Sequence, residues 1–146
     1  SRPRDFQHKG YRPKLKGDLE RIKAAIELMR HARRPLFYTG GGIINSGTKA
    51  SQLLTEFARM TGFPVTLTLM GLGAFPASDP HFLGMLGMHG TYEANLAMHG
   101  CDVMVNIGAR FDDRVTGKLT AFAPNSKLPD VKSLNAFSFS KKMIRL

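Results

Sequence analysis

Three short clusters in the sequence combine residue types that commonly bind ligands. The first is Gly40-Gly41-Gly42, where the missing side chains would let a flat or anionic group approach the backbone. The second joins 68–73 to 86–91, where methionine and histidine between glycines would form a flexible apolar surface for an aromatic heterocycle. The third is 108–114, where two arginines flank two aspartates and a phenylalanine, and arginine donates forked hydrogen bonds to phosphate or ring oxygens.

Each cluster also has a purely structural interpretation, which stays open at this point. The glycine run matches neither G-x-G-x-x-G nor G-x-x-x-x-G-K-[ST], and a strand-to-helix turn by itself could require its glycines. The charged residues after Gly108 could be a solvated group of ion pairs. Four histidines share no metal-like spacing and have no cysteine partners, so we predict no metal site in this chain. They are His31, His81, His89 and His99.

The segments around these clusters alternate between predicted helices and predicted strands. The strands are the apolar runs 35–39, 64–69 and 102–107. The helices are 18–32, which Asp18 would cap, 48–61, which Gly62 would end, and 91–99. The stretch 71–90 is punctuated by glycine and proline and contains no predicted element. Apolar residues recur at helical spacing in the first two helices: Leu19, Ile22, Ile26 and Met29, then Leu53, Leu54, Phe57 and Met60.

This alternation predicts an α/β fold of three layers, in which a mostly parallel sheet carries helices on both faces. Ligands bind to such sheets at the carboxyl ends of the strands, where the loops diverge. Each of the three clusters begins at the end of a predicted strand. We therefore expect them to meet at one edge of the sheet, with Gly41, Leu86 and Arg110 on the same side.

The composition of the 146-residue chain fits one globular domain, because 42% of its residues are hydrophobic. Its net charge of +10 lies mainly at the ends: 1–17 carries +5, 127–146 carries +4 and the middle carries +1. These basic ends lack interleaved aromatic residues, which argues against nucleic-acid binding. No apolar run approaches the ~20 residues of a membrane helix, and no secretory signal is recognisable. The single cysteine, Cys101, excludes an internal disulfide framework.

The sequence pattern changes near both ends of the predicted domain. Residues 7–17 are polar and punctuated by glycine and proline, which predicts a linker, and the helix–strand alternation begins at Asp18. Residues 128–146 show neither helix nor strand periodicity, so we predict that this tail lies outside the fold. Because the chain does not begin with methionine, we expect it to be a piece of a longer protein.

Four motifs resemble the large catalytic subunits of acetolactate synthases (acetohydroxyacid synthases), which are thiamine-diphosphate enzymes. They occur in the same order as in that family, and the last two are long and highly specific together. The motifs are YTGGG at 38–42, LTLMGLGAFP at 67–76, GMLGMHGT at 84–91 and RFDDRVTGK at 110–118. The resemblance covers about residues 3–127, because 3–7 resembles the segment that closes the family's first domain.

The resemblance implies that 1–17 is the end of a preceding domain with a linker and that 18–127 is an incomplete, Rossmann-like central domain. This domain is the second of three, and in that family it binds FAD in a structural role. Carried over position by position, the FAD contacts are Gly41, Thr68, Leu69, Leu86, Gly87, Met88, His89, Gly108, Ala109, Arg110, Phe111 and Asp112. The positions that line the family's substrate and inhibitor channel are Met88, His89, Asp113 and Arg114. No catalytic residue is implied here, because the residues that activate thiamine diphosphate and hold its Mg²⁺ belong to the flanking domains.

The implied activity of the whole enzyme is the condensation of two pyruvates, or of pyruvate and 2-oxobutyrate. The products are 2-acetolactate and 2-aceto-2-hydroxybutyrate, in valine, leucine and isoleucine biosynthesis. The implied partners are the remaining domains, further copies in a homodimer or tetramer, a small regulatory subunit and 2-oxo acids, without nucleic acid or membrane. The implied location is the cytoplasm of a bacterium or an organelle of a eukaryote. We expect the isolated chain to be inactive.

One departure from the family concerns the end of the chain. The family continues after Lys127 into a hydrophobic strand ending in His-Ile-Asp-Ile-Asp, whose acidic end contacts FAD, and 128–146 contains no such segment. Two alternatives therefore remain beside an FAD-binding domain. One is a non-catalytic assembly module with an empty cofactor cleft, and the other is a different thiamine-diphosphate carboligase of the same architecture.

Overall fold

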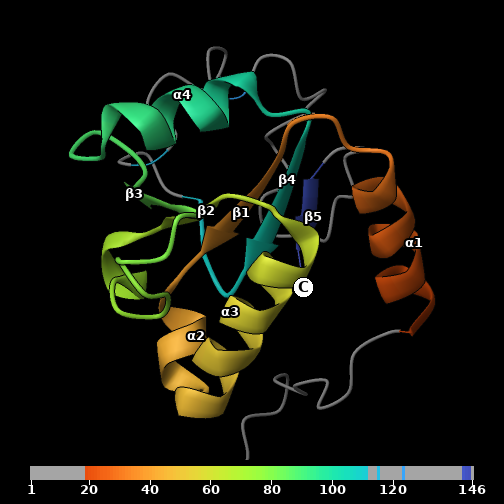
Figure 1. Cartoon of the computed structure of the whole chain (residues 1–146), viewed down its shortest axis with the longest axis horizontal. Helices are drawn as coiled ribbons and strands as arrows, with labels where there is room; N and C mark the ends of the chain where they lie inside the picture. Colours follow the sequence, from red (N-terminus) through yellow and green to blue (C-terminus); the bar gives the residue numbers. More distant parts are fainter. Residues whose placement is uncertain (1–18, 112–114, 116–122, 124–142, 146) are drawn as a thin grey trace, which may run out of the picture.

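A five-stranded parallel sheet forms the centre of the molecule (Figure 1). The computed structural model describes residues 19–111, 115, 123 and 143–145. The strand order is β3-β2-β1-β4-β5, and every neighbouring pair runs parallel. The strands are β1 (Pro35–Thr39), β2 (Val65–Leu67), β3 (Phe82–Met85), β4 (Val103–Ile107) and β5 (Met143–Arg145). The helices are α1 (Leu19–Arg30), α2 (Gly41–Asn45), α3 (Thr48–Thr61), the 3₁₀ turn η1 (Leu69–Gly71) and α4 (Tyr92–Gly100).

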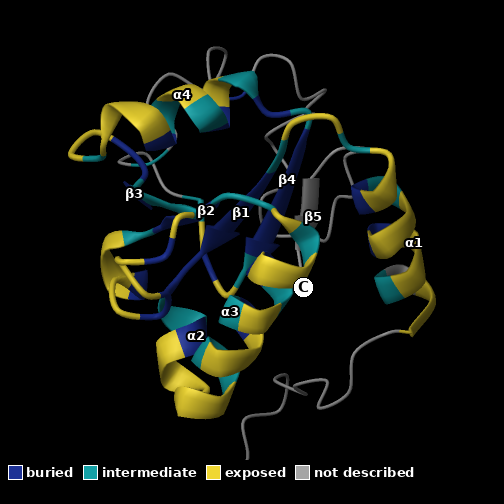
Figure 2. Ribbon diagram, in the orientation of Figure 1, coloured by how far each residue is buried: buried dark blue, intermediate teal, exposed yellow. Residues whose placement is uncertain are grey.

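Helices cover both faces of this sheet, which confirms the predicted three-layer α/β fold. One core cluster joins Phe37 of β1 to Leu54 of α3 and Met29 of α1, whereas the other joins Leu36 and Tyr38 of β1 to α4. Successive residues of β1 therefore enter opposite cores, as the two-residue period of a strand requires. Both faces of β1 and β4 are buried, and Figure 2 shows these central strands in dark blue.

The three predicted strands and the helix 48–61 are confirmed, and the elements that were not predicted include β3 and α2. Helix α3 ends at Gly62, whose φ of 71° is the left-handed conformation that glycine adopts without strain. Strand β3 falls inside the stretch 71–90, where Gly84 with a φ of 93° interrupts a run of only four residues. The five-residue helix α2 follows β1 directly. Periodicity detects neither, because both are shorter than the windows in which a period is visible.

The buried faces of α1 and α3 differ from the predicted apolar stripes. In α1 the residues in the core are Ala25 and Met29, whereas Leu19 is 63% exposed and Ile26 is 48% exposed. In α3 Leu54 and Ala58 are buried, whereas Leu53 and Met60 are exposed. Alanine packs closely against a sheet, so the helices are rotated toward their small residues and away from the larger apolar ones.

The tail 128–146 contributes a strand to the sheet, which corrects part of the prediction. Met143–Arg145 forms β5, which pairs in parallel with 104–106 of β4 at the outer edge. The expectation that the tail lies outside the fold therefore does not hold for these three residues. The strand is not central, as predicted, because β4 separates it from the rest of the sheet. Residues 128–142 and the predicted cap Asp18 lie outside the described residues.

Candidate functional site

The loops that follow four neighbouring strands meet at the carboxyl edge of the sheet. The Gly40 amide after β1 donates to the Ile107 carbonyl of β4 over 3.1 Å, and Gly42 donates to Gly108 over 2.9 Å. The Thr68 amide after β2 donates to the carbonyl of Thr39 over 2.8 Å. The Leu86 amide after β3 donates to Leu67 over 3.0 Å. The predicted meeting of the three clusters at one edge is therefore confirmed as geometry.

The glycines at this edge are required by the close approach of these turns to one another. A Cβ on Gly40 would lie 2.6 Å from the Gly108 carbonyl oxygen, and one on Gly42 would lie 2.7 Å from the Gly108 Cα. A Cβ on Gly71 would lie 2.9 Å from the Gly40 Cα. Real Cβ atoms do not approach backbone this closely, so backbone packing alone explains these three glycines. Gly41 is less constrained, because its nearest atom would be the Met70 carbonyl oxygen at 3.1 Å.

The turn after β4 is held from the side of the α4 core. Gly108 adopts a φ of 64°, and the buried side chain of Asn106 hydrogen-bonds both backbone groups of Ala109. The Tyr38 hydroxyl donates to the Arg110 carbonyl over 3.1 Å, and the Tyr38 ring lies 5.2 Å from that of Phe111. Sequence analysis did not identify Asn106 or Tyr38 as residues that shape this turn. An asparagine and a tyrosine inside apolar strands could have indicated such a role, because a buried polar side chain needs a hydrogen-bond partner.

The loop after β3 is held by α4. Thr91 caps α4 by accepting a hydrogen bond from the Ala94 amide over 3.2 Å, and its hydroxyl donates to the Leu83 carbonyl. Asn95, one turn further along α4, hydrogen-bonds both backbone groups of Gly87. Gly87 itself has a φ of 112°. The loop 86–91 is thereby fixed at both ends, and Asn95 is a third residue whose role was not predicted from the sequence.

The predicted site residues fall into buried, intermediate and exposed groups. Leu86 and Ala109 belong to the core cluster beside α4, so their side chains are not available to a ligand. Leu69, Met70 and Met88 are each at least 66% exposed, and His89 and Arg110 are exposed. The intermediate positions are Gly41, Thr68 and Phe111. Among the described residues the Arg110 guanidinium has no ion-pair partner. Asp112, Asp113 and Arg114 lie outside the described residues.

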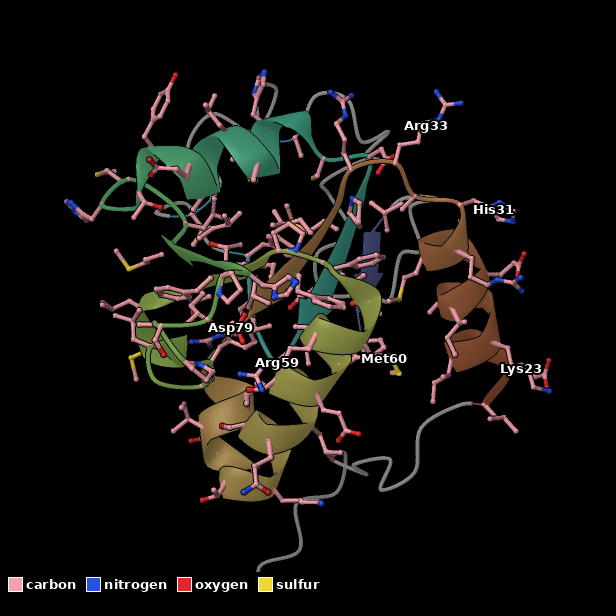
Figure 3. The ribbon with its side chains drawn as sticks, in the orientation of Figure 1. Lys23, His31, Arg33, Arg59, Met60 and Asp79 are labelled. Carbon is pink, nitrogen blue, oxygen red and sulfur yellow. The ribbon has the colours of Figure 1, made fainter. Side chains whose placement is uncertain are left out.

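The one strongly perturbed carboxylate in the described part of the chain lies away from this edge. Asp79 precedes β3 at the amino edge, where it accepts hydrogen bonds from Arg59 Nε over 2.8 Å, the His81 amide over 3.0 Å and His81 Nδ1 over 2.8 Å (Figure 3). The His81 amide, followed by the Arg59 guanidinium, lowers the pKa of Asp79 from 3.8 to about 2. This ion pair, between a buried carboxylate and an exposed guanidinium, ties the loop before β3 to α3.

An apolar pocket of about 490 Å³ is lined mainly by α3, together with Ile43 of α2 and Ile107 at the end of β4. Its lining includes Leu53 and Met60, which explains how α3 carries apolar side chains outside the core. In the described ranges, no three His, Cys, Asp or Glu side chains come together as a metal site would require. No helix of the described part is long and apolar enough to cross a membrane.

Comparison with known proteins decides the family. Residues 22–141 match the family model described as thiamine pyrophosphate enzyme, central domain. The chain belongs to this family. This thiamine pyrophosphate enzyme central domain is 43% identical over 141 residues to the acetolactate synthase large subunit of Haemophilus influenzae. The match covers 97% of this chain and 24% of that protein.

Two further relatives agree with this similarity. The acetolactate synthase isozyme 3 large subunit of Escherichia coli K12 is 45% identical over 124 residues, or 85% of this chain and 21% of that protein. The acetolactate synthase of Mycobacterium leprae is 48% identical over 119 residues, or 82% of this chain and 19% of that protein. This central domain thus spans about a quarter of the length of the relatives it matches.

Proposed function

We propose that this chain is the FAD-binding central domain of an acetolactate synthase large subunit. In the complete protein it would serve the condensation of two pyruvates, or of pyruvate with 2-oxobutyrate, in branched-chain amino-acid biosynthesis. Thiamine diphosphate and Mg²⁺ would be held by the flanking domains, and the complete subunit would assemble with further copies and a regulatory subunit. The names of the relatives and the family of the chain support this proposal.

The observation that carries the FAD assignment is that the loops after β1, β2, β3 and β4 meet at one edge of the sheet. The exposed Arg110 follows β4 at this same edge. A flavin adenine dinucleotide needs cationic or N–H donors for its diphosphate and ring oxygens, and apolar area for its rings. The carboxyl edge offers the exposed guanidinium of Arg110 together with the exposed apolar side chains of Leu69, Met70 and Met88. The residues present therefore fit the chemistry of the cofactor.

In this proposal the roles of the residues follow from their exposure. Arg110 donates to the diphosphate or to ring oxygens, and the backbone of Gly41, Leu86 and Ala109 lines the cleft. Thr68, Leu69, Gly87, Gly108 and Phe111 complete it, and Asp112 is assigned from the resemblance alone. Met88 and His89, with Asp113 and Arg114, line the approach of the 2-oxo acid substrate. The bound flavin supplies a planar ring that joins these loops, in a structural role.

A second candidate function is an assembly module whose cofactor cleft is empty. One observation favours it: Gly40, Gly42 and Gly71 are already explained by the packing of backbone against backbone. The glycine run by itself is then no argument for a ligand. The exposed Arg110 guanidinium, together with the exposed apolar side chains at this edge, favours the FAD proposal over this alternative.

Titration of the 146-residue chain with FAD, followed by quenching of flavin fluorescence, separates the two functions. We expect saturable binding, and we expect Arg110→Ala to weaken it by about 1.5–3 kcal/mol, because a charged hydrogen-bond donor is lost. Arg30→Ala is the matched control, since Arg30 lies on α1 and pairs with the exposed Glu27. Absence of binding at high micromolar FAD would support the empty module and reject the FAD proposal.

A further inference from the structure

Two asparagine side chains hold the two turns that flank the proposed cofactor cleft. Asn106 is completely buried in β4. Its Oδ1 accepts from the Ala109 amide over 3.1 Å, and its Nδ2 donates to the Ala109 carbonyl over 3.1 Å. The planar amide thus engages both backbone groups of one residue, in the way that a neighbouring strand would.

Asn95 repeats this arrangement on the second turn. Its Oδ1 accepts from the Gly87 amide over 3.2 Å, and its Nδ2 donates to the Gly87 carbonyl over 3.1 Å. The same Nδ2 also donates to the Thr91 carbonyl over 3.0 Å. Asn95 lies on α4 and Asn106 on β4, so two independent elements present the same side-chain group to two different turns.

At neutral pH, a primary amide of this length can satisfy both backbone groups because it carries one acceptor and one donor side by side. An ionised aspartate of the same shape accepts but does not donate, so it would face the carbonyl oxygen with a negative charge. An alanine would leave the backbone groups without a partner, and glutamine is one methylene longer. A backbone group left unsatisfied in a buried turn is costly, so the turn would rearrange.

The two amides determine which groups the turns present to the edge of the sheet. They occupy the backbone of Gly87 and Ala109, which precede Met88 and Arg110 directly. The side chains of Met88 and Arg110 are exposed, and their backbone N–H groups have no acceptor among the described residues. Leu86 and Ala109 belong to the same core cluster, so the two turns are also held relative to each other.

We propose that Asn95 and Asn106 are positioning residues for the cofactor, which act by holding the Gly87 and Ala109 turns in the shape that receives it. This inference rests on the proposed FAD binding. In addition, the affinity for FAD would depend on the two hydrogen bonds that each asparagine amide makes to the backbone of its turn. Neither amide would contact FAD itself.

The test uses Asn106→Asp and Asn95→Asp in the 146-residue chain, with the FAD dissociation constant measured at about pH 5 and pH 8. A protonated carboxyl group donates and accepts as the amide does, and burial beside a carbonyl oxygen raises the pKa of the introduced acid. We expect each variant to bind about tenfold more weakly than the unsubstituted chain at pH 8 and within about threefold of it at pH 5. A residue that merely filled space would show no such pH dependence.

Asn45→Asp is the matched control, because Asn45 is exposed at the end of α2. Its FAD affinity should follow the pH profile of the unsubstituted chain. Circular dichroism at each pH separates unfolding from loss of binding. If the buried Asn106→Asp unfolds at pH 8, the less buried Asn95→Asp decides the outcome.

The outcomes distinguish this inference from the function on which it rests. If the unsubstituted chain binds no FAD, the proposed function fails, and the positioning role fails with it before any variant is made. If it binds FAD and both aspartate variants keep its affinity at pH 8, the positioning role is wrong and the FAD proposal stands. Folded variants that lose affinity equally at both pH values also overturn the positioning role.

Discussion

Gly40 carries no side chain because the turn after β4 occupies the space that a Cβ would need. The nearest atoms to such a Cβ, the Gly108 carbonyl oxygen and the Ala109 Cα, are both backbone atoms at 2.6 Å, so no side-chain rotation can relieve the overlap. The turns after β1 and β4 can approach each other this closely only because glycine, which has no Cβ, occupies the contact positions. This contact is what brings the exposed groups of several loops to one place.

We expect Gly40→Ala to destabilise the fold by about 1–3 kcal/mol, because the two turns must move apart. Denaturation in urea measures the change. Gly100→Ala is the control, since the nearest atom to its Cβ, Nη1 of Arg34, would be 4.0 Å away and Gly100 is helical. That control should be neutral or stabilising by up to about 1 kcal/mol. Equal effects of the two substitutions would contradict the packing argument.

The buried carboxylate of Asp79 predicts a pH dependence of stability. Hydrogen bonds from the His81 amide and Arg59 lower the pKa of Asp79 from 3.8 to about 2 in the folded protein. A lowered pKa means that the stabilisation is complete above the unfolded value and is lost as the pH falls through about 2. Asp79→Asn should therefore lower the melting temperature near neutral pH, and the difference should shrink as the pH approaches 2.

Thermal unfolding followed from about pH 7 to pH 2 checks this expectation. Glu20→Gln is the control, because Glu20 only forms an exposed pair with Lys23, and such pairs contribute little. The control should track the unsubstituted chain at every pH. A difference between Asp79→Asn and the unsubstituted chain that persists unchanged at the acidic end would contradict the assigned role of the carboxylate.

At the scale of elements, α3 has two adjacent leucines with opposite environments. Leu54 is 4% exposed in the core beneath α3, whereas Leu53 is 50% exposed, although both line the apolar pocket. We expect Leu54→Ala to cost about 2–5 kcal/mol, because it removes buried apolar area and leaves a cavity. Leu53→Ala, the same substitution one residue earlier, should cost less than about 1 kcal/mol. Urea denaturation of both variants measures this, and a larger loss for Leu53→Ala would show that α3 is rotated otherwise.

At the scale of the whole molecule, the isolated chain should form no acetolactate from pyruvate, even with thiamine diphosphate, Mg²⁺ and FAD in excess. Activation of the thiazolium needs a carboxylate at the aminopyrimidine, and the diphosphate needs a metal with oxygen ligands. The one pair of adjacent carboxylates in the sequence, Asp112 and Asp113, is flanked by Arg110 and Arg114, which favours ion pairing over base catalysis. A colorimetric acetolactate assay measures this, with a complete large subunit as positive control. Turnover by the 146 residues alone would overturn the assignment to a central domain.

The sequence by itself determined the longer helices, three of the five strands, the three-layer fold and the family. Hydrophobic runs bounded by glycine and proline marked β1, β2 and β4, and helical periodicity with Gly62 marked the bounds of α3. Parallel strands have their carboxyl ends at one edge, so the meeting of the three clusters also followed from the order of elements. These features depend on residues close together in the chain, which is why they could be predicted.

Tertiary structure decided which atoms meet at that edge. The burial of Ala25 in place of Ile26 depends on how closely α1 approaches the sheet, and no periodicity in the helix encodes that distance. The reach of Asn95 to Gly87 depends on the path of a loop, and the need for glycine at position 40 depends on a turn 68 residues away. The physical reason is that packing and hydrogen bonding act through space, so side chains that shape the candidate site become visible only once the elements are placed together.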